Sequence, residues 1–278
     1  MVVYALTDKC NLNCIFCSNE DFKTFFSPPD YLPPSLKEIE QWFSSVPRSE
    51  ENITLTGGEP TLRPDLFEVL DFLSASYQKA CITLLTNARR FAYDDYAAKF
   101  AKYERLEIEI PIHSHYERVH DALTGFAGSF SQTLKGIQNL TSLGVRTNIR
   151  VVINKLNYKE LEQMMHFLKS TGGINRVVFI NMRIKGRASL NKDALLVKYK
   201  ESMPYLRKAL AFLKGNGIGI QLLHFPFCVI DKGYWSCTLE NPYKAKASAC
   251  ASCSVEKRCP GMLDCYLRIV GEKEFVAL

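Results

Sequence analysis

The sequence predicts an α/β protein, because short apolar runs alternate with longer segments of helical periodicity along most of its 278 residues. Six runs read as strands, each followed by a helical pattern: residues 2–6, 53–55, 80–85, 106–112, 146–153 and 176–180. Alternation of this kind produces parallel strands joined by right-handed crossovers. Six such units are fewer than the eight of a closed barrel, so we expect a partial (β/α)6, TIM-like barrel.

The segments between the strands carry helix signals. Ser35, followed three residues later by Glu38, matches a capping box and predicts a helix that starts there. Leu66, Leu70 and Leu73 recur at helical spacing within residues 64–74. Further helical patterns cover 97–102, 115–123, 129–143, 158–170 and 195–214, the last with a kink expected at Pro204. Residues 218–223 read as one more strand.

The overall composition is that of a globular protein. Hydrophobic residues make up 47% of the chain and charged residues 23%, and no apolar stretch is long enough to cross a bilayer. No signal peptide precedes the first strand, so we expect a cytoplasmic protein without a membrane partner. The net charge of +6 is compatible with an acidic electron donor, an anionic substrate or nucleic acid, and it does not discriminate among them.

Three cysteines follow the first predicted strand: Cys10, Cys14 and Cys17, spaced C-x3-C-x2-C. Three thiolates can hold three irons of a [4Fe–4S] cubane and leave the fourth iron without a protein ligand. Clusters that only transfer electrons are normally held by four cysteines, so an open iron indicates chemistry at this site. Half of a zinc site and a disulfide framework are the alternatives. The proline-rich stretch 27–34 is expected to form a rigid loop over the cluster.

A glycine-rich segment follows the second predicted strand and reads Gly57, Gly58, Glu59 and Pro60. Glycines let the backbone come close to a ligand, because no Cβ stands in the way. The preceding strand places this GGEP segment at the carboxyl end of a strand, and Thr86 and Asn87 end the third strand at the same edge. Active sites of such barrels lie at this edge. An ordinary turn is the alternative interpretation.

The cysteine triplet and the GGEP segment, in this order, resemble the radical S-adenosylmethionine (radical SAM) superfamily. The resemblance implies that the open iron is chelated by the amino and carboxylate groups of the methionine moiety. It also implies that the GGEP backbone and the Glu59 carboxylate receive the amino group. Phe16 matches the aromatic residue that family members place near the adenine. A six-unit partial barrel is what the resemblance implies for the fold.

Other strand ends supply further candidate cofactor contacts. Arg150 and Asn154 flank the end of the fifth strand, where a solvated strand terminus is an equal alternative. Met182 lies in residues 181–187, which resemble the family's Gly-Arg-containing loop near the adenine. The fourth strand ends with Pro111 and His113 where relatives often have a serine and an acid, so we make no assignment there.

A His-Asp pair, His120 and Asp121, resembles a pair common in this subgroup of the family. We expect it to cap a loop rather than to act in catalysis.

Six further cysteines occupy the C-terminal part: Cys228, Cys237, Cys250, Cys253, Cys259 and Cys265. They resemble the cysteine-rich extension of the SPASM and Twitch subgroups. The resemblance implies one auxiliary [4Fe–4S] cluster held by Cys228, Cys250, Cys253 and Cys259. A structural zinc knuckle is the alternative. We therefore expect a radical SAM barrel in residues 1–222 and an auxiliary cluster domain in residues 223–278.

Cys237 and Cys265 remain unassigned. One could replace Cys228 as a ligand, both could serve a second cluster, or a spare thiol could donate a hydrogen atom to a substrate radical. Packing as small hydrophobic side chains is the default for both, as it is for Cys81.

The resemblance implies reductive cleavage of S-adenosylmethionine to a 5′-deoxyadenosyl radical, which abstracts a hydrogen atom from the substrate. We expect the substrate to be a residue of a ribosomally made peptide that is oxidised or cross-linked. A small-molecule dehydrogenase or epimerase, acting on a sugar or a cofactor precursor, is the first alternative, and a non-catalytic zinc or iron–sulfur binding module is the second. An external reductant such as flavodoxin or ferredoxin is implied, and nucleic acid is not an expected partner.

Because the first strand starts at the N-terminus, we expect a leader peptide to be bound by a partner protein or by the barrel itself.

Overall fold

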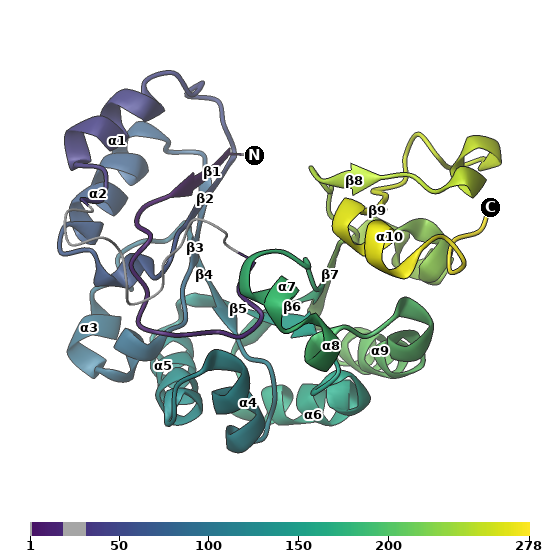
Figure 1. Cartoon of the computed structure of the whole chain (residues 1–278). Coiled ribbons are helices and arrows are strands. Elements are labelled where there is room, and N and C mark those ends of the chain that lie inside the picture. Colours follow the sequence, from purple (N-terminus) through teal and green to yellow (C-terminus); the bar gives the residue numbers. More distant parts are fainter. Residues whose placement is uncertain (1, 19–31) are drawn as a thin grey trace.

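A computed structural model describes residues 2–18 and 32–278. Seven strands form one sheet in the sequential order β1 to β7, and every neighbouring pair is parallel. The strands are β1 (Val2–Ala5), β2 (Asn52–Thr56), β3 (Cys81–Leu85), β4 (Leu106–Pro111), β5 (Arg146–Ile153), β6 (Ile174–Asn181) and β7 (Gly219–Leu223). The predicted partial barrel is confirmed, and residues 218–223, read as an additional strand, extend its sheet to seven strands (Figure 1).

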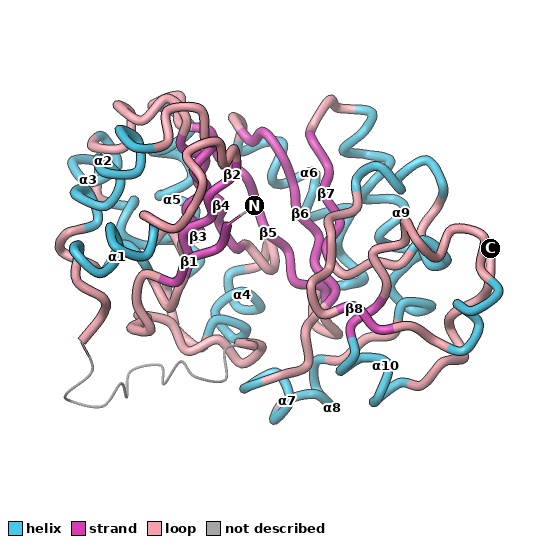
Figure 2. Tube along the Cα trace, turned by 90° about the horizontal axis from the view of Figure 1, so that it is seen from above, coloured by secondary structure: helices cyan, strands magenta, loops and turns pink. Residues whose placement is uncertain are grey.

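Helices follow the strands in the predicted order and cover one face of the sheet (Figures 1 and 2). They are α1 (Leu36–Phe43), α2 (Leu66–Ser76), α3 (Asp94–Ala98), α4 (Glu117–Thr124), α5 (Ser129–Ser142), α6 (Leu161–Thr171) and α9 (Tyr199–Gly215). The predicted capping box is present, because Ser35 N–H donates to the Glu38 carboxylate at 2.8 Å and Glu38 N–H donates to Ser35 Oγ at 3.3 Å.

Two short helices after β6, α7 (Gly186–Leu190) and α8 (Lys192–Leu195), were not predicted. Each is too short to show a periodicity. Conversely, α3 ends at Ala98 and does not continue over the predicted residues 97–102. The proline-rich stretch 27–34 lies largely outside the described residues, so the loop predicted there stays a prediction.

The two faces of the sheet differ in polarity. On β4, Leu106, Ile108 and Ile110 are buried in the core, whereas Glu107 and Glu109 alternate with them and point to the opposite, concave face. Arginines of β5 and β6 neutralise these carboxylates: Arg150 of β5 contacts Glu109 at 2.5 Å, and Arg176 of β6 contacts Glu107 at 2.7 Å. The concave face of this partial barrel is therefore polar, unlike the apolar interior that fills a closed barrel.

The C-terminal region continues the core beyond β7. It contains the antiparallel pair β8 (Lys244–Ala245) and β9 (Met262–Leu263) and the helix α10 (Asp264–Val270). Tyr266 of α10 accepts a hydrogen bond from the Tyr199 backbone N–H at 3.0 Å, and Leu239 N–H donates to Leu222 O at 2.9 Å beside β7. These contacts fix the region against the end of the sheet (Figure 1). In the described part of the chain, the helices are all too short or too polar to span a bilayer.

Candidate active site

The loop that carries the first three cysteines, residues 7–18 (the cysteine loop), docks on the GGEP segment. Gly58 N–H donates to Thr7 O and Glu59 N–H donates to Lys9 O, both at 2.7 Å. A Cβ on Gly57, whose φ is +145°, would lie 2.2 Å from Thr7 O, and one on Gly58 would lie 2.3 Å from Lys9 O. The two glycines are therefore required for this close approach of one protein segment to another, in addition to any approach of a ligand.

Glu59 joins the ends of β2 and β3. Its carboxylate is only 1% exposed and accepts four hydrogen bonds: from Thr61 N–H (3.0 Å), Thr61 Oγ1 (2.6 Å), Thr86 Oγ1 (2.6 Å) and Asn87 N–H (2.7 Å). Burial raises the pKa of Glu59, and the hydrogen bonds from Thr61, Thr86 and Asn87 oppose that rise. The predicted residues of this edge are thus brought together, with Pro60 buried beside them at the start of a 3-10 turn.

The end of β3 holds the cysteine loop from a second side. Asn87 Nδ2 donates to Asn11 Oδ1 at 2.7 Å, and the Arg89 guanidinium donates to Asn11 O at 2.5 Å. Asn87 is held in turn by Thr133 Oγ1, which donates to its carbonyl at 2.9 Å. Thr86 and Asn87, predicted as cofactor contacts at the end of a strand, therefore link Glu59 to the loop that carries the cysteines; their contact with a cofactor stays a prediction.

Helices α4 and α7 complete the support of the cysteine loop. Asn13 N–H donates to Thr124 O (2.9 Å), and Ile15 N–H donates to Leu123 O (3.0 Å). From α7, Ala188 N–H donates to Cys17 O at 3.2 Å. Figure 1 shows the loop running from β1 past α4 towards α7. These partners carry no sequence signature, because mostly backbone atoms make the contacts.

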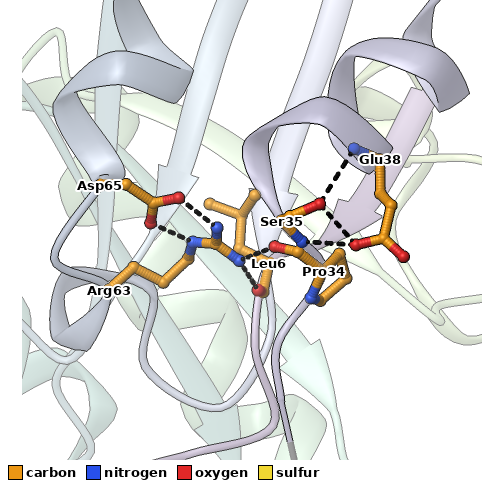
Figure 3. A network of polar contacts seen from close by, with 6 residues as sticks. All are labelled: Leu6, Pro34, Ser35, Glu38, Arg63 and Asp65. Atoms are coloured by element: carbon orange, nitrogen blue, oxygen red, sulfur yellow. Dashed lines mark hydrogen bonds and ion pairs between the residues drawn. The ribbon is translucent and has the colours of Figure 1, made fainter.

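Arg63 fixes the base of the chain excursion that contains the cysteines (Figure 3). Its buried guanidinium donates to Leu6 O (2.7 Å), at the end of β1, and to Pro34 O (2.8 Å), just before α1. Asp65 pairs with the same guanidinium through two hydrogen bonds, of 3.0 and 2.7 Å. Sequence analysis did not identify Arg63; its only signal is an arginine two residues before an aspartate and three residues after the GGEP segment.

The thiols of Cys10, Cys14 and Cys17 lie close enough to influence one another. Burial raises the pKa of Cys10 to about 12, with Glu59 and Cys17 adding to the effect. Burial likewise raises the pKa of Cys14, with further contributions from Cys10 and Cys17. Leu12 N–H donates to Cys10 Sγ at 3.4 Å. Buried sulfurs that disfavour their own negative charge suit a metal cluster, because its irons supply the compensating positive charge.

The other candidate cofactor contacts lie at the same edge of the sheet in different environments. The Phe16 ring meets His113 edge-on, with centroids 4.4 Å apart. Arg150 is engaged by Glu109, whereas Asn154 is fully buried and accepts a hydrogen bond from Leu156 N–H at 2.9 Å. Met182 is buried just after β6. Asn154 is therefore not a solvated strand terminus, and its contact with a cofactor stays a prediction, as do those of Phe16, Arg150 and Met182.

The His-Asp pair caps the start of α5, as predicted. The Asp121 carboxylate accepts hydrogen bonds from Gly128 N–H (2.6 Å), Phe130 N–H (2.8 Å) and Ser129 Oγ (2.8 Å). His120 is buried behind it, with its Nδ1 3.4 Å from His113 N–H. Asp121 therefore caps the loop before α5, whereas His120 contacts the residues that follow β4.

Of the six C-terminal cysteines, four line one cavity and two do not. This cavity is lined by Cys228, Cys250, Cys253 and Cys259, the four predicted to share a cluster. Backbone N–H groups point at two of these sulfurs: those of Phe227 and Gly261 at Cys259 (3.4 Å each) and that of Leu278 at Cys253 (3.5 Å). Four cysteines lining one cavity and N–H groups directed at two of the sulfurs are the chemistry that an iron–sulfur cluster requires.

Cys265 and Cys237 do not line this cavity. Cys265 is buried in α10, and Cys237 packs against the core at the end of a short turn. Among the described residues, no group of three or more His, Cys, Asp or Glu side chains is arranged to hold a single metal ion.

Comparison with known proteins decides the family. The family description "Radical SAM superfamily" matches residues 4–168, more than half of the chain. The chain belongs to the radical SAM superfamily. The cofactors of this family are a [4Fe–4S] cluster and S-adenosylmethionine, and the matched region contains the cysteine loop and the GGEP segment on which the prediction rested.

Curated relatives of this radical SAM protein include enzymes with different substrates. The GTP 3′,8-cyclase of Haemophilus influenzae is 30% identical over 171 residues, which cover 59% of this chain and 48% of that protein. The mycofactocin maturase MftC of Mycobacterium tuberculosis is 28% identical over 189 residues, which cover 68% of this chain and 46% of that protein. The chain thus spans about half the length of the curated relatives it matches.

Solved structures show the same fold. Streptococcus suis SuiB bound to precursor peptide SuiA matches 100% of this chain and 74% of that structure, with a TM-score of 0.68 and 15% identity. A second match is anSMEcpe with bound AdoMet and the Cp18Cys peptide, which covers 79% of this chain and 63% of that structure at a TM-score of 0.61 and 18% identity.

Proposed function

We propose that this chain is a radical SAM enzyme that abstracts a hydrogen atom from a residue of a ribosomally made peptide, and that the net reaction is an oxidation or a cross-link. The observation that carries the proposal is the convergence of Cys10, Cys14 and Cys17 on a loop docked against the GGEP segment at the carboxyl edge of the sheet. When bound, the cluster and S-adenosylmethionine supply a one-electron cleavage that yields a 5′-deoxyadenosyl radical.

Residues around the cysteine loop would hold and orient these cofactors. Cys10, Cys14 and Cys17 would ligate three irons, and Phe16 would lie beside the adenine. The remaining proposed cofactor contacts come from the ends of β2, β3, β5 and β6: Gly57, Gly58, Glu59, Pro60, Thr86, Asn87, Arg150, Asn154 and Met182. Because most acceptor sites of Glu59 are already used by Thr61, Thr86 and Asn87, its role would be chiefly to position the edge, and the GGEP backbone would meet the amino group.

We further propose that residues 223–278 form an auxiliary cluster domain next to a barrel of residues 1–222. Its single [4Fe–4S] cluster would be held by the four cysteines that line the C-terminal cavity. Four protein ligands leave no open iron, which favours electron transfer over substrate binding at this cluster. Cys237 and Cys265, which lie outside the cavity, would be packing residues, and a role as hydrogen-atom donor is the alternative for either of them.

Several similarities support a peptide substrate. A structure of similar fold is described as bound to a precursor peptide and another as bound to a peptide, and one curated relative is named a maturase. The named GTP cyclase supports the second candidate, a small-molecule substrate. An external flavodoxin or ferredoxin would supply the electron, and the net charge of +6 suits an acidic donor protein.

Iron content and product analysis test the proposal. Anaerobically reconstituted protein should contain about eight irons, the sum of two cubane clusters. With dithionite and S-adenosylmethionine it should release 5′-deoxyadenosine, and the Cys10→Ala variant should not, whereas a Cys81→Ala control should. A candidate precursor peptide should lose two hydrogens in mass. Zinc without iron would leave the binding-module alternative, and turnover of a nucleotide or sugar but no peptide would leave the small-molecule alternative.

A further inference from the structure

An arginine with no anionic partner in the described part of the chain lies at the junction of the sheet and the C-terminal region. Arg183 follows β6, and its guanidinium lies over the Tyr243 ring, 4.0 Å from the centroid. Within residues 2–18 and 32–278, this guanidinium makes no ion pair or hydrogen bond. Stacking on an aromatic ring occupies only the face of a guanidinium, so its N–H edge stays available to a ligand.

A buried amide close to Tyr243 also has an unused donor. Asn241 is 4% exposed, and its Oδ1 accepts a hydrogen bond from Tyr243 N–H at 3.0 Å. Its Nδ2 is buried and has no partner among the described residues. A buried donor left unpaired costs free energy, so such a group in a native fold indicates a missing acceptor. The same loop is fixed to β7, because Leu239 N–H donates to Leu222 O.

His224, the residue directly after β7, has a strained backbone conformation. Its φ is +69°, in the left-handed region that non-glycine residues rarely adopt. Two hydrogen bonds hold it there: Tyr199 Oη donates to His224 O at 2.5 Å, and His224 Nδ1 lies 3.1 Å from Asn181 O. Because a carbonyl oxygen can only accept, Nδ1 carries the proton. Strain of this kind at the carboxyl end of a strand is typical of functional positions.

The charges around His224 leave one cation uncompensated. Burial lowers the pKa of His224 to about 4, and the positive charges of Arg150 and Arg183 add to the shift. Arg150 is already paired with Glu109, at 2.5 Å. Among the described residues, Arg183 is therefore a positive charge without an anionic partner, close to an unpaired amide donor.

We infer that Arg183 and Asn241 form a subsite, beside His224, that binds a carboxylate group of the substrate. A planar guanidinium edge matches the two oxygens of a carboxylate, and an amide N–H supplies a further donor. The subsite lies at the carboxyl ends of β6 and β7, the edge of the sheet that also holds the cysteine loop. The inference rests on the proposed peptide substrate and names a chemical group that this substrate carries, either an acidic side chain or a chain terminus.

Three blocked amino acids serve as probes for the reconstituted enzyme, without reductant. N-acetylglutamate α-amide carries only a side-chain carboxylate, N-acetylglutamine only a terminal one, and N-acetylglutamine amide carries neither. We expect calorimetry to show one of the two acids binding about tenfold to a hundredfold more tightly than the diamide, the range for a hydrogen-bonded charge. Whichever acid binds identifies the source of the carboxylate.

Variants decide whether Arg183 and Asn241 are responsible. Arg183→Gln and Asn241→Asp should each remove the preference for the acid, and Asn241→Asp keeps the Oδ1 that Tyr243 needs. Arg183→Lys keeps the charge and should retain part of the preference, which guards against a folding defect in Arg183→Gln. The matched control is Arg146→Gln, because Arg146 starts β5 at the opposite edge of the sheet.

Two results would overturn the inference: equal or undetectable binding of all three probes, or an acid preference that survives Arg183→Gln. Neither result argues against the proposed function, because release of 5′-deoxyadenosine and iron content are measured without these probes.

Discussion

Replacing Glu59 by glutamine tests whether this residue organises the carboxyl edge of the sheet. Each carboxylate oxygen accepts one backbone N–H: Oε1 from Thr61 at 3.0 Å and Oε2 from Asn87 at 2.7 Å. A backbone N–H can only donate a hydrogen bond, whereas a hydroxyl can rotate and accept one instead. In Glu59→Gln, the side-chain NH2 must therefore face one of the two N–H groups in either orientation of the amide, so at least one buried donor loses its acceptor.

The expected loss of stability follows from the hydrogen bonds removed. One hydrogen bond to a charged group contributes about 1.5–3 kcal/mol, which is a large share of the usual stability of a domain. Urea unfolding followed by circular dichroism measures this loss. We also expect less iron after reconstitution, because Asn87 holds Asn11 of the cysteine loop. Glu104→Gln is the control, since Glu104 is exposed. A Glu59→Gln protein within about 1 kcal/mol of the parent and with full iron would refute this reasoning.

Three further predictions concern the base of the cysteine loop, the C-terminal cysteines and pH. Arg63→Met should lower the free energy of unfolding by about 3 kcal/mol or more, because it leaves two carbonyls and Asp65 without their donor. Reconstitution of this variant should also incorporate less iron. Unchanged iron content would contradict this prediction. Cys259→Ser should reduce the iron count from about eight to about four and still allow release of 5′-deoxyadenosine. Cys265→Ala should keep both clusters. Equal iron content in the two variants would contradict the assignment of Cys259, and not Cys265, to the auxiliary cluster. Burial lowers the pKa of His120 to about 4, below its unfolded value near 6.5, so the unfolded state binds more protons between these values. The stabilisation is complete above pH 6.5 and decreases as the pH falls towards 4, by about 2 kcal/mol at pH 5. Unfolding at pH 7.5 and 5 should show a smaller pH effect in His120→Gln, and an unchanged slope would argue against a buried neutral imidazole.

The sequence alone determined the class of fold and supplied the cysteines that we propose as cluster ligands. Alternating apolar runs and helical periodicity depend only on which residues are close along the chain, so strands and helices could be placed from them. The spacing of Cys10, Cys14 and Cys17 is equally local, and so is the capping box at Ser35. The short helix α7 was missed for the opposite reason, since a single turn has no periodicity to detect.

Only the tertiary structure showed how the edge of the sheet is held together. Gly57 was expected to approach a ligand, yet it also makes room for a backbone carbonyl of the cysteine loop. Arg63 holds two carbonyls that are far apart in the sequence, and Arg183 meets Tyr243 only because the C-terminal region docks beside β7. Contacts of this kind depend on which segments become neighbours in space, and backbone carbonyls are the same in every residue type. No spacing or residue type in the chain could therefore have indicated them.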